Sequence, residues 1–370
     1  MLPHPTTPQG LRRMPVKQKM AVSLKSLMSS VLGGGKTSTP AYNQLFEKTD
    51  PEKDGEECLK DCDSCTVRYP RGFKIDNEDV LYGQVKGWST HVLVGTGKTD
   101  WVRDVGDEKG SVMEAIGKAD GPTNGRLMLS ASNMPTPHDT NDYSEPTTVL
   151  LLPAFTLVEN VHPTNVTTLI AELINKAPTT ISPLAASSFP QSLPSPDADV
   201  PVLGTKTCPH SAVVLMCSHK TRDARCGQSA PLLRKEFERH LRPLGLYRDL
   251  HDERPGGVGI YFINHVGGHK YSANVMIYRR PNAFGQDEVG ETAGHSTETN
   301  GIFNSAANGT TNDEGATKPD VGAAQGIWLA RVRPEDCENL VRYTVLKGKL
   351  VKPESQLRGG FDRVKGMTSW

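Results

Sequence analysis

The chain has 370 residues, of which 36% are hydrophobic, and its 42 basic side chains are balanced by 42 acidic ones. The length allows two domains of ordinary size, while the low hydrophobic content indicates substantial segments outside any core. Zero net charge without a concentrated basic face argues against nucleic-acid binding, and no apolar run approaches the roughly 18 residues of a membrane span. Seven cysteines, an odd number without the spacing of a disulfide framework, favour a reducing compartment.

Residues 1–46 contain six basic side chains and no acidic ones, together with the partly apolar stretch VSLKSLMSSVL. This composition is typical of a mitochondrial presequence. However, Pro3, Pro5, Pro8 and Pro15 weaken a helix from its start. We therefore expect a disordered basic tail on a cytoplasmic protein, with a mitochondrial location as the alternative.

Three cysteines, Cys58, Cys62 and Cys65, lie close together in the acidic segment EECLKDCDSC. Cys62 and Cys65 have C-x-x-C spacing, but the strand that should precede such a redox motif is not predicted. Nearby carboxylates would raise the thiol pKa values, and a fourth metal ligand is not evident. The segment is therefore interpreted as reduced surface thiols, with a second metal or redox site as the alternative.

Residues 47–177 alternate between strand and helix patterns after this cysteine-rich segment. THVLVGTG, RLMLSAS and TTVLLLPAF are typical of strands, and SVMEAIGKA and NVTTLIAELINKA are typical of helices, which indicates an α/β domain. The stretch GTGKT at 95–99 is similar to the end of a phosphate-binding loop. Because Val92 stands where that motif requires its first glycine, we interpret GTGKT as a turn.

Residues 178–204 form a Pro- and Ser-rich linker that cannot bury a core and is expected to be extended and flexible. Residues 205–351 follow the order β-α-β-β-β-α, which is that of half or more of a thioredoxin-like fold. Within them, 285–325 has almost no large apolar residue and is predicted to be a disordered insertion. Residues 352–370 are predicted to be a polar C-terminal tail that adds no core element.

Two cysteines and two histidines of the second domain are the strongest functional signal. Cys217 and Cys226 have C-x8-C spacing, and His265 and His269 enclose two glycines in the sequence HVGGH. Thiolates and imidazoles together suit zinc or an iron-sulfur cluster. The glycines argue against a helix, and both pairs follow predicted strands, so the four side chains are expected to converge at one edge of a sheet. Taken singly, each residue has a structural or surface role as its alternative.

The segments CSHKTRDARCG, GLYRD, FINHVGGHKYSANVMIY and IWLARV resemble the sucrase/ferredoxin-like proteins, a family of thioredoxin-like ferredoxins. The resemblance extends over residues 213–332 apart from the insertion, and VGTGKT is the clearest shared stretch of the N-terminal half. It implies a [2Fe-2S] cluster bound by Cys217, Cys226, His265 and His269. It also implies that the first domain is a degenerate thioredoxin-like domain without a cofactor.

The resemblance implies an electron-transfer protein with an unidentified redox partner, and not an enzyme with its own substrate. Histidine ligands make a cluster less negative in potential than an all-cysteine cluster, and their second ring nitrogens couple reduction to protonation. Two alternatives remain open: a structural zinc module on the same four residues, and a thiol-disulfide oxidoreductase that uses Cys62 and Cys65. Three basic residues of the ligand loop either stabilise the cluster's charge or dock a partner, or are simply solvated: Lys220, Arg222 and Arg225.

The last three residues, Thr368, Ser369 and Trp370, resemble the C-terminal tryptophan signal of cytosolic iron-sulfur proteins. That signal docks on the cytosolic assembly machinery, although Thr368 is not the long apolar residue often found at its position. The resemblance implies that Trp370 contacts this machinery and that the cluster is inserted in the cytosol. The alternative is that Trp370 packs on the domain as a large apolar side chain.

Overall fold

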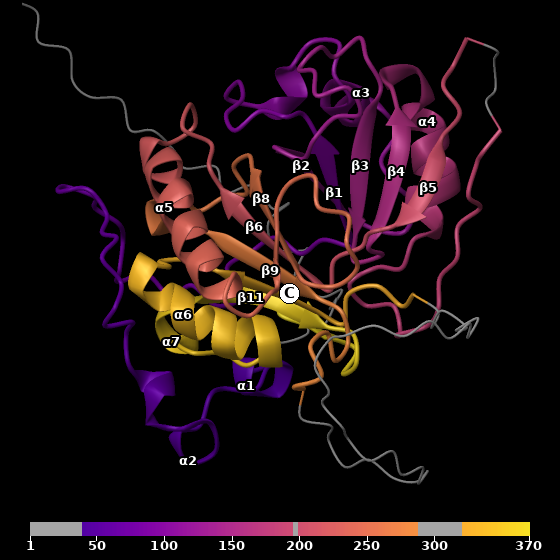
Figure 1. Ribbon diagram of the computed structural model, residues 1–370. Helices are drawn as coiled ribbons and strands as arrows, with labels where there is room; N and C mark the ends of the chain where they lie inside the picture. The colour runs from indigo at the N-terminus through magenta and orange to yellow at the C-terminus, as the bar shows by residue number, and fades with distance from the viewer. Residues whose placement is uncertain (1–38, 195–198, 288–319) are drawn as a thin grey trace, which may run out of the picture. The chain divides into compact units, whose positions relative to one another are not determined.

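A mixed β-sheet of 12 strands runs through the part of the chain that the structure describes. The structure is a computed structural model, and it describes residues 39–194, 199–287 and 320–370 (Figure 1). The N-terminal half of the sheet is built from residues that precede the first metal-ligand candidate. The elements up to that point are α1 (Tyr42–Leu45), α2 (Pro51–Asp54), β1 (Thr90–Gly95), α3 (Val112–Lys118), β2 (Leu127–Ser132), β3 (Thr147–Leu152), β4 (Thr156–Val161), α4 (Val166–Thr168) with further helical turns to Lys176, and β5 (Gly204–Thr207).

The C-terminal half begins with the strand that carries the first predicted ligand. Its elements are β6 (Ala212–Cys217), α5 (Ala224–Leu241), β7 (Tyr247–Arg248), β8 (Val258–Ile263), β9 (Val275–Arg279), β10 (Gln325–Leu329), α6 (Cys337–Asn339) with further helical turns to Val345, α7 (Pro353–Gln356), β11 (Leu357–Asp362) and β12 (Met367–Thr368).

The two halves of the sheet share one strand order. β1 and β2 are parallel neighbours connected through α3, and the antiparallel strands β3 and β4 follow on the other side of β1. Likewise, β6 and β8 are parallel neighbours connected through α5, and the antiparallel strands β9 and β10 follow on the other side of β6. Apart from the two-residue β7, which pairs with β8, both halves repeat the order β-α-β-β-β-α, which confirms the predicted α/β class with two thioredoxin-like units. The halves join where β2 pairs with β8 through Ser132 and Ile263.

Apolar sequence runs explain why the centre of the sheet is covered on both faces. β6 reads AVVLMC and β8 reads VGIYFI, and every residue of both strands is buried. Such continuous runs are typical of parallel strands between two covering layers. α5 contributes Leu233, Phe237 and Leu241 to the core on one face and packs against α6 (Figure 1). None of the helices in the described residues is both long and apolar enough to cross a membrane.

The predicted C-terminal tail is part of the sheet, so that prediction is wrong. β11 pairs with β10 and then with β12, and Phe361 is fully buried. The sequence LRGGFD conceals this strand because glycines are unfavourable in strands. The backbone packing requires them, since a Cβ on Gly360 would lie 2.1 Å from the carbonyl oxygen of Gly326.

The end of the predicted N-terminal tail also belongs to the fold. α1 lies within residues 39–46, and Leu45 and Phe46 are fully buried in the core that contains residues of β6 and β11. The expectation of a disordered tail is therefore wrong for these eight residues. Residues 1–38 lie outside the described part of the chain.

The described residues of the predicted linker are held against the fold, which corrects the expectation of a flexible connector. The hydroxyl of Thr180 donates a hydrogen bond to the carbonyl of Trp88 at 2.6 Å, and the N–H of Thr205 in β5 donates to the carbonyl of Gln191 at 3.0 Å. Composition alone does not reveal these backbone partners. Residues 195–198 lie outside the described chain, as do 288–319 of the predicted insertion.

Candidate metal centre

The predicted ligands follow the ends of two parallel strands. Cys217 is the last residue of β6, and it is paired in register with Ile263, the last residue of β8. His265 follows two residues later. Because parallel neighbours end at the same edge of a sheet, this register brings the cysteine and the histidine together. The expected convergence at a sheet edge is therefore observed for these two residues.

The other two ligand candidates lie beside this pair. The Sγ atoms of Cys217 and Cys226 and one ring nitrogen of His265 are all within 4.8 Å of one another. Cys226 belongs to the first turn of α5, after the N-cap residue Asp223. His269 Nδ1 lies 3.4 Å from His265 Nε2. Three of the four candidates thus form one group, and His269 contacts that group through His265 but is not part of it.

The two glycines between the histidines allow the loop to approach a buried cation. Gly267 and Gly268 have φ angles of +95° and +71°, which are strained for other residues. A Cβ on Gly268 would lie 2.7 Å from the guanidinium of Arg358, whose Nη1 donates to the Gly267 carbonyl at 2.9 Å. The group that the loop approaches is Arg358 of β11, which sequence reasoning did not identify.

The thiols and imidazoles are in an environment that suits a metal. A hydrogen bond from Cys217 lowers the pKa of Cys226, with further hydrogen bonds from His265 and Ser272, so the pair holds a negative charge. Burial lowers the pKa of His269, which keeps its imidazole neutral. His265 Nδ1 is buried without a hydrogen-bond partner among the described residues. An unpaired buried nitrogen costs free energy, and the donor set suits zinc or an iron-sulfur cluster.

A third histidine connects the two ligand loops, and sequence reasoning missed it. The Nε2–H of His219 donates to the carbonyl of Trp101 at 3.0 Å, and its Nδ1 accepts from the backbone N–H of His265 at 3.2 Å. These two bonds require a neutral ring with its proton on Nε2. His219 is fully buried, and it is only two residues after Cys217. This position next to a predicted ligand is the sequence feature that could have identified His219.

The turn that follows β1 holds the ligand loop from the N-terminal half. Ser218 Oγ donates to the carbonyl of Thr99 at 2.7 Å, and the carboxylate of Asp100 accepts bonds from the backbone and hydroxyl of Thr221. GTGKT is therefore a turn, as predicted from the missing glycine. Its Lys98 donates to the hydroxyl of Tyr143 at 2.9 Å.

Two arginines of the ligand loop are engaged locally. Arg225 makes a two-pronged ion pair with Asp223, with nitrogen–oxygen distances of 2.9 Å and 2.8 Å, and also bonds the carbonyl of Lys74. Arg222 donates to the carbonyl of Arg103 at 3.4 Å. Lys220 is exposed. Stabilisation of a cluster or docking of a partner by these residues stays a prediction.

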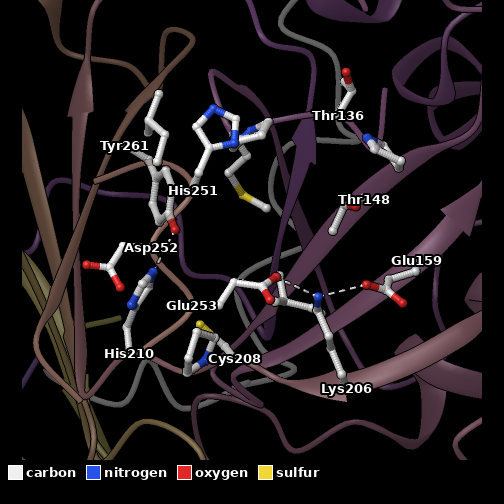
Figure 2. A pocket seen from close by; sticks show the side chains of 16 residues that line it. Thr136, Thr148, Glu159, Lys206, Cys208, His210, His251, Asp252, Glu253 and Tyr261 are labelled. Carbon is white, nitrogen blue, oxygen red and sulfur yellow. Dashed lines mark hydrogen bonds and ion pairs between the residues drawn. The ribbon is translucent and has the colours of Figure 1, made fainter. Parts of the chain in front are cut away.

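A cavity of about 260 Å³ lies elsewhere and contains none of the four ligand candidates (Figure 2). Lys206 within it forms ion pairs with Glu159 at 2.8 Å and Glu253 at 2.9 Å, so its charge is neutralised. Burial lowers the pKa of His210 to about 4 and raises that of the Cys208 thiol to about 11. An uncharged imidazole and an unreactive thiol give this cavity no evident chemistry.

The N-terminal cysteines are not surface thiols, which corrects that interpretation. Cys58, Cys62 and Cys65 are all buried, and Cys62 N–H donates to the carbonyl of Glu335 at 3.0 Å. The segment therefore contacts the C-terminal half of the fold. Cys337, the first residue of α6, is also fully buried.

The thioredoxin-like order and the convergent cysteines and histidines together define a candidate metalloprotein of the α/β class. The chain belongs to the sucrase/ferredoxin-like family, whose sequence model matches residues 81–359.

Several curated proteins are similar to this chain. Actin patches distal protein 1 of Saccharomyces cerevisiae is 32% identical over 251 residues, which are 64% of this chain and 76% of that protein. Altered inheritance of mitochondria protein 32 of Clavispora lusitaniae is 28% identical over 159 residues, covering 43% of this chain and 39% of that protein. The protein of the same name from Debaryomyces hansenii is 26% identical over 140 residues, covering 38% and 33%. The matches thus span less than half of the two latter proteins. No solved structure matches the chain significantly.

Proposed function

We propose that this protein transfers electrons through a [2Fe-2S] cluster bound by Cys217, Cys226, His265 and His269. The observation that carries the proposal is the meeting of two buried thiols and the His265 imidazole at one sheet edge, with His269 Nδ1 3.4 Å from His265 Nε2. A mixed cysteine and histidine set is the ligand type of Rieske clusters, in which two histidines replace two cysteines on one iron. Such a cluster supplies one-electron chemistry when it is bound.

The protein groups divide the site into a buried and an accessible side. Cys217 and Cys226 are 2% and 0% exposed, so their thiolates are shielded from solvent and oxidants. The side chain of His269 is 44% exposed. A partner that approaches this loop would meet an imidazole first, and the ring nitrogen that does not bind metal can exchange its proton with water. We therefore propose that electron and proton both pass at His269.

Arg358 of β11 holds the histidine loop, which consists of residues 265–269. Its guanidinium bonds the Gly267 carbonyl at 2.9 Å and Asn274 Oδ1 at 2.8 Å, and it stacks over the Trp328 ring at 4.3 Å. Burial lowers its pKa to about 10, so it stays charged at neutral pH. A buried positive charge near the ligands favours the more negative, reduced state of a cluster. In the proposed function Arg358 therefore helps to raise the reduction potential.

The visible spectrum of the purified protein tests the proposal against its two alternatives. An iron-sulfur cluster gives charge-transfer bands that bleach when dithionite is added, with about two iron and two sulfide per chain. A zinc module on the same residues would be colourless. A thiol-disulfide oxidoreductase would keep its activity when both histidines are replaced. Either of those results would reject the electron-transfer proposal.

The location and the docking partner form a further part of the proposal. We infer a cytoplasmic protein whose cluster is inserted by the cytosolic iron-sulfur assembly machinery through Trp370, and an unidentified redox partner at the histidine loop. The support is the resemblance of the last three residues to a docking signal. In the fold, the Trp370 ring lies 4.3 Å from the ring of Trp88, and it is only partly buried. Docking would therefore require Trp370 to leave a packed position.

A further inference from the structure

A second group of ligand-type side chains lies where the N-terminal cysteine segment meets two helices. Cys62 Sγ, a ring nitrogen of His240 and a carboxylate oxygen of Glu338 are within 4.8 Å of one another. His240 belongs to the last turn of α5, and Glu338 belongs to α6. Three segments that are far apart in the sequence therefore meet here, away from the residues of the proposed cluster.

We propose that Cys62, His240 and Glu338 bind a zinc ion that ties the N-terminal cysteine segment to α5 and α6. Zinc accepts sulfur, nitrogen and oxygen ligands, and sites with three protein ligands leave the fourth tetrahedral position to water. At zinc bond lengths of about 2.0 to 2.3 Å, the ligand atoms would lie roughly 3.5 Å apart. The observed group needs only a small contraction to reach that geometry.

Two of the three side chains are in the protonation states that zinc requires. Burial lowers the pKa of His240, so its imidazole is neutral at pH 7 and has a free lone pair. A hydrogen bond with Cys62 lowers the pKa of Glu338, so this group is a carboxylate. Arg239 Nη2 donates a hydrogen bond to Cys62 Sγ at 3.3 Å.

The charges around the three side chains are compatible with a bound divalent cation. Arg239 is bound by Glu236 at 2.7 Å, and Glu338 is bound by Arg342 at 3.0 Å. The two guanidiniums are thus matched by two carboxylates, so these arginines leave no unpaired positive charge that would repel a cation. Glu236 Oε2 also lies 3.8 Å from His240 Nε2 and adds to the negative potential there. A divalent cation would be attracted by that potential.

The second cysteine of the C-x-x-C motif is outside the group and provides a matched control. Cys65 N–H donates to the carbonyl of Cys62 at 3.2 Å, so both belong to one tight turn. The Cys65 Sγ instead contacts the carbonyl of Val67 at 3.5 Å, and burial raises its pKa. A zinc site on Cys62 does not need Cys65. A redox pair that forms a Cys62–Cys65 disulfide needs both.

The site would stabilise the folded state, because its ligands come together only there. Segments around residues 62, 240 and 338 are separate in an unfolded chain, so zinc binds the native state preferentially. Water can reach the open position, since the Glu338 side chain is 30% exposed. The expected result is a thermal unfolding midpoint that rises with zinc concentration.

Zinc chloride titration of the full chain with its cluster in place tests the proposal. After treatment with a chelator, the parent should bind one zinc beyond any metal on the cluster ligands, and its unfolding midpoint should rise. Cys62→Ser and His240→Gln should weaken this zinc at least tenfold, whereas Cys65→Ser should bind like the parent. Cobalt(II) should give a thiolate charge-transfer band in the parent and in Cys65→Ser, but not in Cys62→Ser.

Two results would overturn the proposal. Equal zinc affinity in the parent and in Cys62→Ser would remove the site, and equal losses in Cys62→Ser and Cys65→Ser would point to a dithiol pair instead. If Cys62→Ser fails to fold, the partly exposed Glu338→Gln replaces it and must also weaken zinc tenfold. Iron and sulfide measured in the same samples report on the cluster ligands separately, so this test does not depend on the proposed function.

Discussion

The two thioredoxin-like halves use the same backbone arrangement for different purposes. At the end of β1, Thr96 N–H donates to the carbonyl of Ser132 at 2.8 Å. At the end of β6, Ser218 N–H donates to the carbonyl of Ile263 at 3.0 Å. The chain therefore leaves both pairs of parallel strands in the same way. Where the first half has Gly95, however, the second half has Cys217.

This difference shows that the fold supplies a position and the side chains supply the chemistry. The N-terminal edge uses backbone carbonyls and the Asp100 carboxylate to hold its neighbour: the carbonyls of Thr99 and Trp101 accept bonds from Ser218 and His219, and Asp100 accepts from Thr221. The C-terminal edge provides thiols and imidazoles. The N-terminal half has no predicted ligands, and its structural role is to hold the ligand loop of the C-terminal half in place.

The largest effect on cluster content should come from removal of a thiolate ligand, because the C-terminal half then lacks a cysteine ligand, as the N-terminal half does. Cys217→Ala or Cys226→Ala should abolish the cluster, because one iron then lacks a ligand. Iron and acid-labile sulfide per chain measure this loss. Cys208→Ala is the matched control, since Cys208 is equally buried but lies in the cavity away from the ligands. Full iron content in Cys226→Ala would contradict the ligand assignment.

Replacement of a histidine ligand by cysteine should change the reduction potential of the C-terminal half without removing its cluster. His269→Cys should retain iron and lower the reduction potential by on the order of 100 mV, because a thiolate donates more charge than an imidazole. Protein-film voltammetry measures the midpoint. The same midpoint in parent and variant would show that His269 is not a ligand.

The pH dependence of the parent should come from the accessible imidazole. Burial lowers the pKa of His269, which favours the neutral ring before an electron arrives. Reduction adds negative charge and favours protonation, so higher pH opposes reduction. The midpoint should fall by up to about 59 mV per pH unit for one coupled proton. Voltammetry at several pH values checks this slope, and a flat midpoint would exclude the coupling.

Loss of the two His219 hydrogen bonds, which form a bridge between Trp101 and His265, should have a moderate effect on stability. His219→Phe leaves the Trp101 carbonyl and the His265 N–H unpaired, which should cost roughly 1–3 kcal/mol of unfolding free energy. Urea denaturation measures this cost, and the rate of iron loss to a chelator reports on the ligand loop. His219→Gln can replace both hydrogen bonds and should lie closer to the parent. Equal behaviour of His219→Phe and the parent would show that the bridge is dispensable.

The sequence predicts those parts of the molecule that depend on neighbouring residues. AVVLM identifies β6 because an unbroken apolar run suits a strand covered on both faces, and the ends of β6 and β8 then place Cys217 and His265. The pairs that sequence reasoning missed are long-range. His240 is 178 residues from Cys62, and Arg358 reaches the histidine loop from a strand concealed by its glycines. Only the folded arrangement brings such groups together.

The smallest effect is expected at Trp370, where packing and docking lead to opposite results. Trp370 stacks on Trp88 with ring centroids 4.3 Å apart, which should contribute about 1–2 kcal/mol. Trp370→Ala removes this contact. Gly87→Ala keeps the tryptophan but displaces it, because a Cβ on Gly87 would lie 2.0 Å from the indole. Both variants should therefore lower the thermal unfolding midpoint by a few degrees.

Cluster content in cells separates the two roles of Trp370. If the side chain only packs, both variants lose stability but keep the iron content of the parent. If the assembly machinery binds it, Trp370→Ala should lower cluster occupancy in its own host, although the purified protein still accepts a cluster by chemical reconstitution. Gly87→Ala should then retain or raise occupancy, since it frees the indole for docking. Full occupancy of Trp370→Ala in cells would reject docking and leave packing against Trp88 as the role of this residue.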